Sequence, residues 1–442
     1  MRAGDVAVSR PRSILSTTLS ASRQHGNFSI STVVAVDTDL LPAPRVAVLH
    51  APVVGFMTLA AALGTASIYP LQPAIADVAG SLHASTAQIG SALACGPIGY
   101  LAGLALLVPL VDRFAPRSVL STQFGALAAA LALTAGVGST WLLGLGLGLA
   151  GAGSSVGAQL SSIAGRFTAP RRRATILGVV TAGISAGILV GRIGGGWLTN
   201  LIGWRGTLLV FAVACAVVAL AARLVLPATA GSARSGYLAT LRKLPQLYLR
   251  FPLLRLAAGR GALWFFAFCA VWAGIAVALS QPPFSYSPER IGAYAGAGLL
   301  GIVATRVAGV WTDRVGARRV ILAGLALAAA AAVVLGTCLS NTAVTLVCLG
   351  LFDGGLFAAQ VANQSTVLAI DPAAPARFNS AYMLVYFVGG SLGTAFGAAA
   401  VGWFGWPTTA IVTAGAIIVA AVITMTARET QIRRVTPGSA EC

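Results

Sequence analysis

Charged side chains are scarce in this sequence, and acidic ones are the scarcest. Asp, Glu, Lys and Arg make up only 9% of the 442 residues, with 11 acidic against 29 basic side chains, while 57% of the residues are hydrophobic. A soluble protein of this length needs a surface richer in charge, because its exterior faces water. The shortage of charge therefore excludes an ordinary soluble globular protein.

Histidine and cysteine are also rare, at three and six residues. No Cys-x-x-Cys pair occurs, and no His has a partner at metal-ligand spacing, so we expect no disulfide framework, no metal and no cofactor. The sequence lacks a GxxxxGK[ST] phosphate loop and the HExxH motif. These absences argue against ATP-driven work and against an enzyme.

Long apolar runs fill most of the chain, and each is long enough to cross a hydrocarbon core of about 30 Å as a helix. The sequence therefore predicts an all-α membrane protein with twelve transmembrane helices. Ser85 and Gln88 form a capping-box pattern at the start of the second run. The expected spans are 52–77, 86–110, 118–137, 140–163, 174–198, 206–226, 259–280, 290–311, 319–338, 341–365, 378–401 and 406–426.

The basic residues predict an orientation. With the N-terminus in the cytoplasm, all but four of the 29 Lys and Arg fall in the tails and cytoplasmic loops. Arg205 and Arg290 then face outward, while Arg192 and Arg306 lie within spans; we expect Arg306 to be structural. This bias indicates a multi-pass protein of the cell's inner (plasma) membrane with both termini cytoplasmic. We therefore interpret the net charge of +18 as a sign of membrane orientation and of contact with anionic membrane lipid, and we expect no nucleic-acid partner.

The chain divides into two similar halves. Asp112 and Asp313 occupy related Asp-Arg loops 201 residues apart, and a glycine ridge recurs 202 residues later, so both halves have the same orientation. Parallel repeats around a central cavity are typical of transporters, and we expect a monomer because the repeat already supplies both halves. The expected parts are a disordered tail (1–50), a six-helix bundle (51–226), a cytoplasmic linker (227–258), a second six-helix bundle (259–427) and a C-terminal tail (428–442).

The ridge in the first half has an arginine beside it, within an apolar span. Gly187, Gly191 and Gly195 share one helix face, which lets another helix approach closely; the equivalents in the second half are Gly389, Gly393 and Gly397. Arg192 has two interpretations. It either snorkels to the outer membrane surface or, with Thr181 and Ser185 on the same stripe, faces a wet cavity and binds an anion or a polar substrate group.

Asp353 is the acidic residue placed deepest in a span, about the middle of the run 341–365. Burial favours the neutral form of a carboxyl group, which suits a group that loads and releases a proton. A purely structural role, in a permanent salt bridge or hydrogen bond, is the alternative. Further polar residues are expected to line the same pathway: Tyr69, Gln72, Gln159, Gln360, Asn363 and Gln364.

One loop carries a family signature. The spacing of Gly309, Asp313, Arg314, Gly316, Arg318 and Arg319 resembles the cytoplasmic loop motif of the major facilitator superfamily. The first-half copy keeps Asp112, Arg113 and Arg117 but has Val108 and Ala115 in place of the glycines. The resemblance implies that these loops latch neighbouring helices and control the switch between inward-facing and outward-facing states.

The glycine ridge carries a second resemblance. Gly178, Gly187, Gly191, Gly195 and Gly196 match the antiporter signature of drug exporters, with Arg192 where that signature has proline. The chain is similar to a bacterial branch of multidrug- or sugar-efflux proteins, although Leu147 stands where drug–proton antiporters have an arginine. The resemblance implies proton-coupled export of a small-molecule substrate by alternating access. The alternatives are a proton-coupled importer or facilitator, or a sensor that does not transport.

Overall fold

The computed structural model describes residues 18–20, 31–33, 50–168, 170–229, 244–371 and 375–427. The chain separates into two compact units, residues 1–47 and 48–442. In the first, β1 (Thr18–Ser20) pairs with β2 (Ser31–Val33) in antiparallel register. The rest of the N-terminal tail, which we expect to be disordered, lies outside the described residues. The C-terminal tail also lies outside them.

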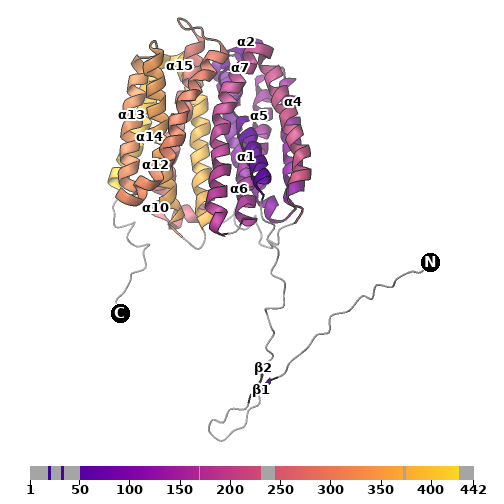
Figure 1. Cartoon of the computed structure of the whole chain (residues 1–442). Coiled ribbons are helices and arrows are strands. Elements are labelled where there is room, and N and C mark those ends of the chain that lie inside the picture. The colour runs from indigo at the N-terminus through magenta and orange to yellow at the C-terminus, as the bar shows by residue number, and fades with distance from the viewer. Residues whose placement is uncertain are drawn as a thin grey trace, which may run out of the picture. The chain divides into compact units, whose positions relative to one another are not determined.

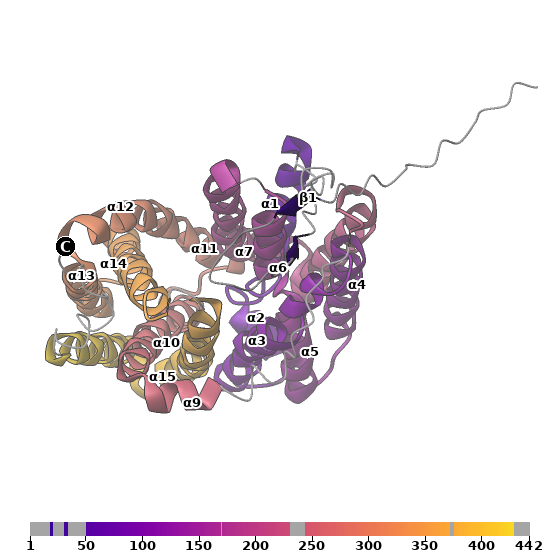
Figure 2. The ribbon, with the colours of Figure 1, turned by 90° about the horizontal axis from the view of Figure 1, so that it is seen from below.

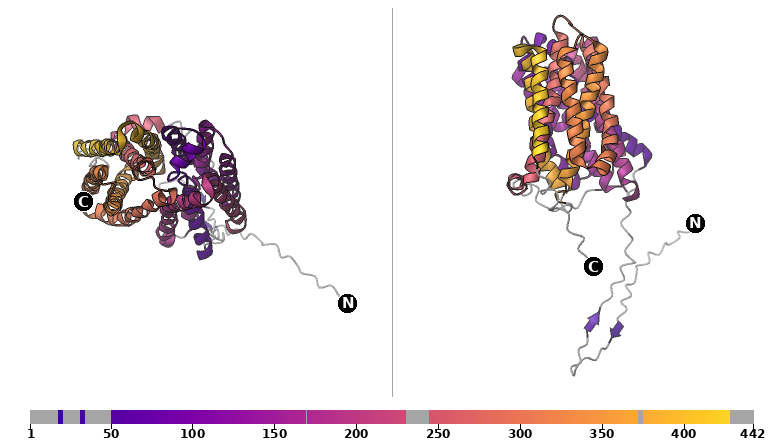
Figure 3. Two further views of the ribbon diagram at one scale, coloured as in Figure 1. Left: turned by 90° about the horizontal axis from the view of Figure 1, so that it is seen from above. Right: turned by 90° about the vertical axis from the view of Figure 1, so that its left-hand side faces the viewer.

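The second unit is built from helices in two groups. The first half of the chain and the second half form neighbouring bundles whose helix axes are roughly parallel (Figures 1, 2 and 3). The first bundle contains α1 (Ala51–Ala66), α2 (Ile75–Ser81), α3 (Thr86–Leu106), the 3-10 helix η2 (Val108–Asp112), α4 (Pro116–Ala135), α5 (Thr140–Gly153), α6 (Val156–Arg166) and α7 (Pro170–Val225). The second contains α10 (Pro252–Ser280), α11 (Pro288–Ala293), the 3-10 helix η3 (Tyr294–Gly298), α12 (Leu299–Val315), α13 (Ala317–Thr337), α14 (Thr342–Leu368) and α15 (Pro375–Thr426).

Within the described residues, nine helices are long and apolar enough to cross a membrane. Two of them contain pairs of the predicted spans: α7 turns at Gly203 (φ 73°) and α15 turns at Gly405 (φ 77°), two positions 202 residues apart. Glycine adopts positive φ without the steric cost that a Cβ brings. The first predicted span is represented by the shorter α1, so the count of twelve stays a prediction.

Two predicted spans leave helical geometry for two residues or more. The chain leaves helical geometry after Ala66 and resumes it at Ile75, because Pro70 and Pro73 cannot continue the hydrogen-bond ladder. The fourth predicted span divides into α5 and α6 at Ser154–Ser155. The capping box of Ser85 and Gln88 is confirmed at the start of α3.

The linker is partly helical. α9 (Leu244–Arg250) lies within residues expected to form a loop, and α10 begins at Pro252 rather than at 259. The Tyr248 hydroxyl donates to the carbonyl of Ala381, which anchors α9 to α15. Burial raises the pKa of Tyr248 to about 12, so the hydroxyl remains a donor throughout the physiological range.

The two bundles meet tightly at the end opposite the start of α1, here called the distal end. A Cβ at Gly292 of α11 would lie 2.6 Å from the carbonyl oxygen of Arg192 in α7, and Gly196 contacts the backbone of Pro288. The Asn200 amide donates to Glu289 at 3.1 Å across the same boundary. These contacts close the space between the bundles at the distal end.

Candidate functional site

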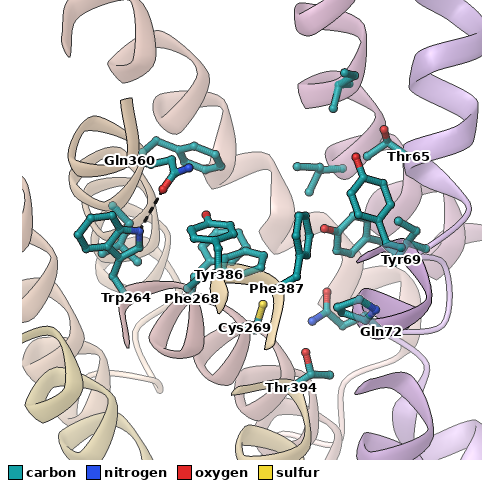
Figure 4. Close-up of a pocket in the computed structure, with 18 of the residues that line it drawn as sticks. Thr65, Tyr69, Gln72, Trp264, Phe268, Cys269, Gln360, Tyr386, Phe387 and Thr394 are labelled. Carbon is teal, nitrogen blue, oxygen red and sulfur yellow. Dashed lines mark hydrogen bonds between the residues drawn. The ribbon is translucent and has the colours of Figure 1, made fainter. Parts of the chain in front are cut away.

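A cavity of about 190 Å³ lies between the two bundles. Residues from α1 and the break that follows it, α3, α7, α10, α14 and α15 line the cavity, so both halves of the chain contribute (Figure 4). Its walls are predominantly apolar, and Arg192 is the one charged residue among those described as lining it.

Arg192 is 4% exposed and surrounded by aromatic rings. Its guanidinium carbon lies 4.2 Å from the ring centroid of Trp272, 5.1 Å from that of Tyr69 and 5.5 Å from that of Phe268. The Nε donates to Oε1 of Gln72 at 2.7 Å. The two Nη groups have no hydrogen-bond partner among the described residues.

These contacts explain how the membrane interior tolerates this arginine. Placing Arg at the centre of a helix costs about 2.5–3.5 kcal/mol on insertion scales. A desolvated cation–π contact contributes about 2 kcal/mol, and a hydrogen bond from a charged group about 1.5–3 kcal/mol. The surrounding rings and Gln72 therefore offset the insertion cost, and the Arg192 side chain is buried at the cavity wall.

Asp353 lies close to this arginine without touching it. It is 1% exposed, and its Oδ1 accepts from Nε1 of Trp272 at 3.1 Å. In the part of the chain that the structure describes, Arg192 and Asp353 form no ion pair, and Asp353 is absent from the cavity lining. Trp272 is therefore the residue that connects the two charges.

Trp272 belongs to a regular series of contacts between α10 and α14. Residues of α10 spaced four apart meet successive turns of α14, which runs in the opposite direction. From the distal end, the pairs are Trp272–Asp353, Phe268–Phe357 (ring centroids 5.8 Å), Trp264–Gln360 (3.3 Å) and Arg260–Asn363 (2.7 Å). The two central pairs line the cavity.

Glycines set the position of Arg192. Gly187, Gly191 and Gly195 lie against the backbones of Ala62, Ala66 and Pro70, so α7 packs directly on α1 and its break. This approach brings Arg192 beside Tyr69 and Gln72. In the second half, the backbone contacts between α15 and α10 are Gly389 with Ala262, Gly393 with Phe266 and Gly397 with Ala270. Gly178 has open space around it and takes no part in this packing.

The face of α7 that meets the cavity differs from the one expected. Ile184, Ile188 and Arg192 line it, whereas Thr181 and Ser185 do not. The expected polar stripe is therefore wrong as a description of the cavity wall, because the two isoleucines stand directly in line with the arginine.

Gln159 also lies away from the cavity. Its amide donates to the carbonyl of Leu107 and to Oε1 of Gln123, both at 2.7 Å, and Gln123 in turn donates to Ser155 at 3.0 Å. These bonds satisfy the carbonyl at the end of α3 and connect Gln159, through Gln123, to the break between α5 and α6. The expectation that Gln159 lines the cavity does not agree with this placement.

Of the polar residues expected on α14, only Gln360 lines the cavity. Asn363 is buried, donates to Ala257 at 3.0 Å and accepts from Arg260. Gln364 donates to Asn379 at 2.9 Å and so joins α14 to α15.

The Asp-Arg loop of the first half is held by neighbouring helices. Ser162 donates to Asp112 at 3.4 Å, and Arg166 donates to the carbonyl of Val111 at 2.7 Å. Burial lowers the pKa of Arg166, while the nearby Asp112 carboxylate raises it. The backbone N–H of Arg117 donates to Pro227 at 3.3 Å. Arg113 lies in the turn that follows η2.

The second-half loop has a different backbone. Gly316, between α12 and α13, has φ 88°, whereas the corresponding Ala115 has φ −64°. The replacement of glycine in the first half is therefore accommodated by extended geometry. Arg318 donates to the carbonyl of Met425 at 2.8 Å, which joins this loop to α15. The remaining signature residues, Gly309, Asp313, Arg314 and Arg319, lie on α12 and α13.

Sequence inspection missed the aromatic residues of α10 and the buried charge of Arg260. The count of basic residues places Arg260 on the cytoplasmic side, yet its side chain is only 6% exposed and lies inside α10. Arg260, Trp264, Phe268 and Trp272 recur every four residues, and this spacing is the signal that identifies one helix face. By contrast, Arg306 lies on an exposed face of α12.

The comparisons with known sequences agree with this architecture. The Major Facilitator Superfamily profile matches residues 54–289 and 262–440. The chain is 30% identical over 352 residues to the "Uncharacterized transporter YgaY" of Escherichia coli O157:H7, covering 79% of this chain and 89% of that protein. It is 30% identical over 376 residues to the "Probable transporter SCO4007" of Streptomyces coelicolor, covering 83% and 84%.

Solved structures show the same fold. A bacterial homologue of the human lysosomal transporter Spinster, inward-facing and unoccupied, matches with a TM-score of 0.74 and 15% identity over 90% of this chain and 100% of that chain. The nucleoside transporter NupG matches with a TM-score of 0.70 and 13% identity, covering 84% and 99%. The chain belongs to the Major Facilitator Superfamily and is a multi-pass membrane transporter.

Proposed function

We propose that this transporter couples the passage of a small organic solute to the movement of protons, with Asp353 as the proton-carrying group. The observation that carries the proposal is the position of Trp272, which contacts Arg192 in the cavity and the buried Asp353. A charge in the membrane interior is expensive, so proton uptake relieves a cost at Asp353. Solute at Arg192 and proton at Asp353 then influence each other through one side chain.

Alternating access is supported by the contacts between the bundles. They close the distal end through Gly196, Gly292 and the pair Asn200–Glu289. With both termini in the cytoplasm, as we propose from the distribution of basic residues, this conformation faces inward. The loops around Asp112 and Asp313 then control the switch at the cytoplasmic side. We also propose that the protein acts as a monomer in the inner membrane.

Two directions of transport are candidates. Resemblance to the antiporter signature favours export in exchange for protons, although close helix packing also explains Gly187, Gly191 and Gly195. Uptake of solute together with protons is favoured by the charges when the solute is an anion. Such a solute adds a negative charge beside Arg192, so its binding favours protonation of Asp353.

The direct test is accumulation of dyes, antibiotics, sugars and small organic acids in cells that express the protein. We expect accumulation of some compounds to change, downward for export or upward for uptake, and to return to baseline when the proton gradient is collapsed. Asp353→Asn should abolish the effect, whereas Asp77→Asn, the same change at an exposed residue of α2, should preserve it. Transport that survives both gradient collapse and Asp353→Asn contradicts proton coupling.

A further inference from the structure

We infer that the transported solute is a small aromatic anion, whose carboxylate or equivalent acidic group binds the Nη groups of Arg192 and whose one or two planar rings lie between the aromatic walls of the cavity. This inference rests on the proposed function, because it identifies the occupant of the same cavity.

The charge of the solute follows from what faces the cavity. Arg192 is the charged residue of the described lining, and its Nη groups are free of protein partners there. Asp353 lies behind Trp272 and offers no carboxylate to a cation. A cationic solute would meet a like charge in a low-dielectric site, whereas an anion gains charge-assisted hydrogen bonds from two parallel N–H groups.

The aromatic character follows from the walls. Eight of the nineteen lining residues are aromatic, although Phe, Trp and Tyr make up only 7% of the chain. Phe265 and Tyr386 stack with ring centroids 4.0 Å apart, and Phe387 contacts Tyr100 across the two bundles at 4.8 Å. Offset-stacked and edge-to-face arrangements favour a further ring over a saturated chain of the same size.

The size of the cavity limits the solute. Pockets for drug-sized ligands enclose about 300–1,000 Å³, whereas this one encloses about 190 Å³. One or two fused rings with a single acidic substituent suit that volume better than a multi-ring drug.

Gln360 adds a second polar contact on the α14 side of the cavity. Its Oε1 accepts from Trp264 and from the Tyr382 hydroxyl, which fixes the orientation of the amide. Its Nε2 has no acceptor among the described residues and is available as a donor to the solute (Figure 4). Arg192 and Gln360 thus both present donors, which suits a solute that carries acceptor oxygens.

Calorimetric titration of the purified full-length protein with four matched probes tests this inference. The probes are 2-naphthoate, neutral 2-naphthalenemethanol, cationic 2-naphthylmethylammonium and the saturated anion decalin-2-carboxylate. We expect 2-naphthoate to bind about tenfold or more tightly than each of the others, because only it combines a negative charge for Arg192 with planar rings for the aromatic walls. Arg192→Gln should remove its advantage over the neutral probe, and Phe268→Leu should remove its advantage over the saturated anion.

Three results would overturn the inference: equal or tighter binding of the cation, no binding of any probe to folded protein, or an anion preference that persists in Arg192→Gln. Arg192→Lys keeps the charge and serves as the variant of choice should Arg192→Gln misfold; it should keep the preference for the anion over the cation. Binding requires neither a gradient nor a proton carrier. A failed preference therefore leaves proton-coupled transport of another solute standing, and failed proton coupling leaves the binding preference standing.

Discussion

Trp272 presents its ring face to Arg192 and its Nε1 edge to Asp353, so the two charges share one side chain instead of forming an ion pair. The separations are 4.2 Å from guanidinium carbon to ring centroid and 3.1 Å from Nε1 to Oδ1. A direct buried salt bridge would have to break before Asp353 could be neutralised, and breaking such a pair is costly. The intervening ring lets Asp353 gain or lose a proton while Arg192 keeps its place.

Trp272→Phe tests this arrangement, because it keeps a ring over Arg192 and removes only the hydrogen bond to Asp353. That bond stabilises the charged carboxylate, so its loss should move the pH of half-maximal transport upward, with solute affinity changed by less than about threefold. Initial transport rates across a pH series measure the shift. The control is Trp264→Phe, which removes the bond to Gln360 and should alter solute affinity but leave the pH profile in place. An unchanged profile in Trp272→Phe contradicts the link between Trp272 and the proton.

Gly191→Ala should destabilise the protein, because the added Cβ would lie 2.5 Å from the carbonyl oxygen of Ala66 and push α7 away from α1. Overpacking of this kind costs about 1–3 kcal/mol. Gly194→Ala, on the same helix with nothing within 4 Å of its Cβ, should be neutral or mildly stabilising. Melting temperatures in detergent compare the two variants, and equal behaviour would remove the packing explanation for the ridge.

The general architecture was predictable from the sequence, since the lengths of the apolar runs and the offset between repeated motifs can be read directly along the chain. The break at Pro70 and Pro73 and the capping box at Ser85 were visible for the same reason. The residues that line the cavity were not predictable in this way. Ile184 and Ile188 replace Thr181 and Ser185 there because the rotation of α7 is set by its glycine contacts with α1, which span about 120 residues of sequence.

The site was harder still to predict. Arg192 and Asp353 stood out because charges are rare in apolar runs. Their relation depends on Trp272, which has no feature in the sequence that distinguishes it from other apolar residues of its span. Gln159, like Gln360, is a glutamine within an apolar run, and yet its amide bonds the end of α3 and Gln123 rather than lining the cavity. A polar residue in a span therefore indicates that its side chain has a hydrogen-bond partner. Only the three-dimensional arrangement shows whether that partner is protein or solute.

Gly316→Ala should destabilise the loop between α12 and α13, because φ 88° is unfavourable for a residue with a Cβ. The expected cost is about 1–3 kcal/mol. Gly309→Ala, in the same signature but in open space on α12, should cost little. Thermal unfolding of both variants checks this. Equal stability would mean that the second-half loop tolerates the extended geometry of Ala115.

Arg260 and Asn363 should behave as a coupled pair. Asn363→Leu leaves the buried Arg260 Nε without its acceptor and should cost about 1.5–3 kcal/mol, which lowers the melting temperature. Replacing both residues, as Arg260→Met with Asn363→Leu, should recover part of that stability because no unpaired charge remains. The double-mutant cycle gives the coupling directly. Additive effects would show that the two residues stabilise the protein independently.

The most direct test of proton-coupled transport through Asp353 uses purified protein in proteoliposomes that contain a pH-sensitive dye. Addition of a transported solute should change the internal pH in the wild-type protein and in the exposed-residue control Asp77→Asn. Asp353→Asn should still exchange labelled solute across the membrane but move no protons. A solute-dependent pH change of normal size in Asp353→Asn would contradict the account, because the proton would then be carried elsewhere.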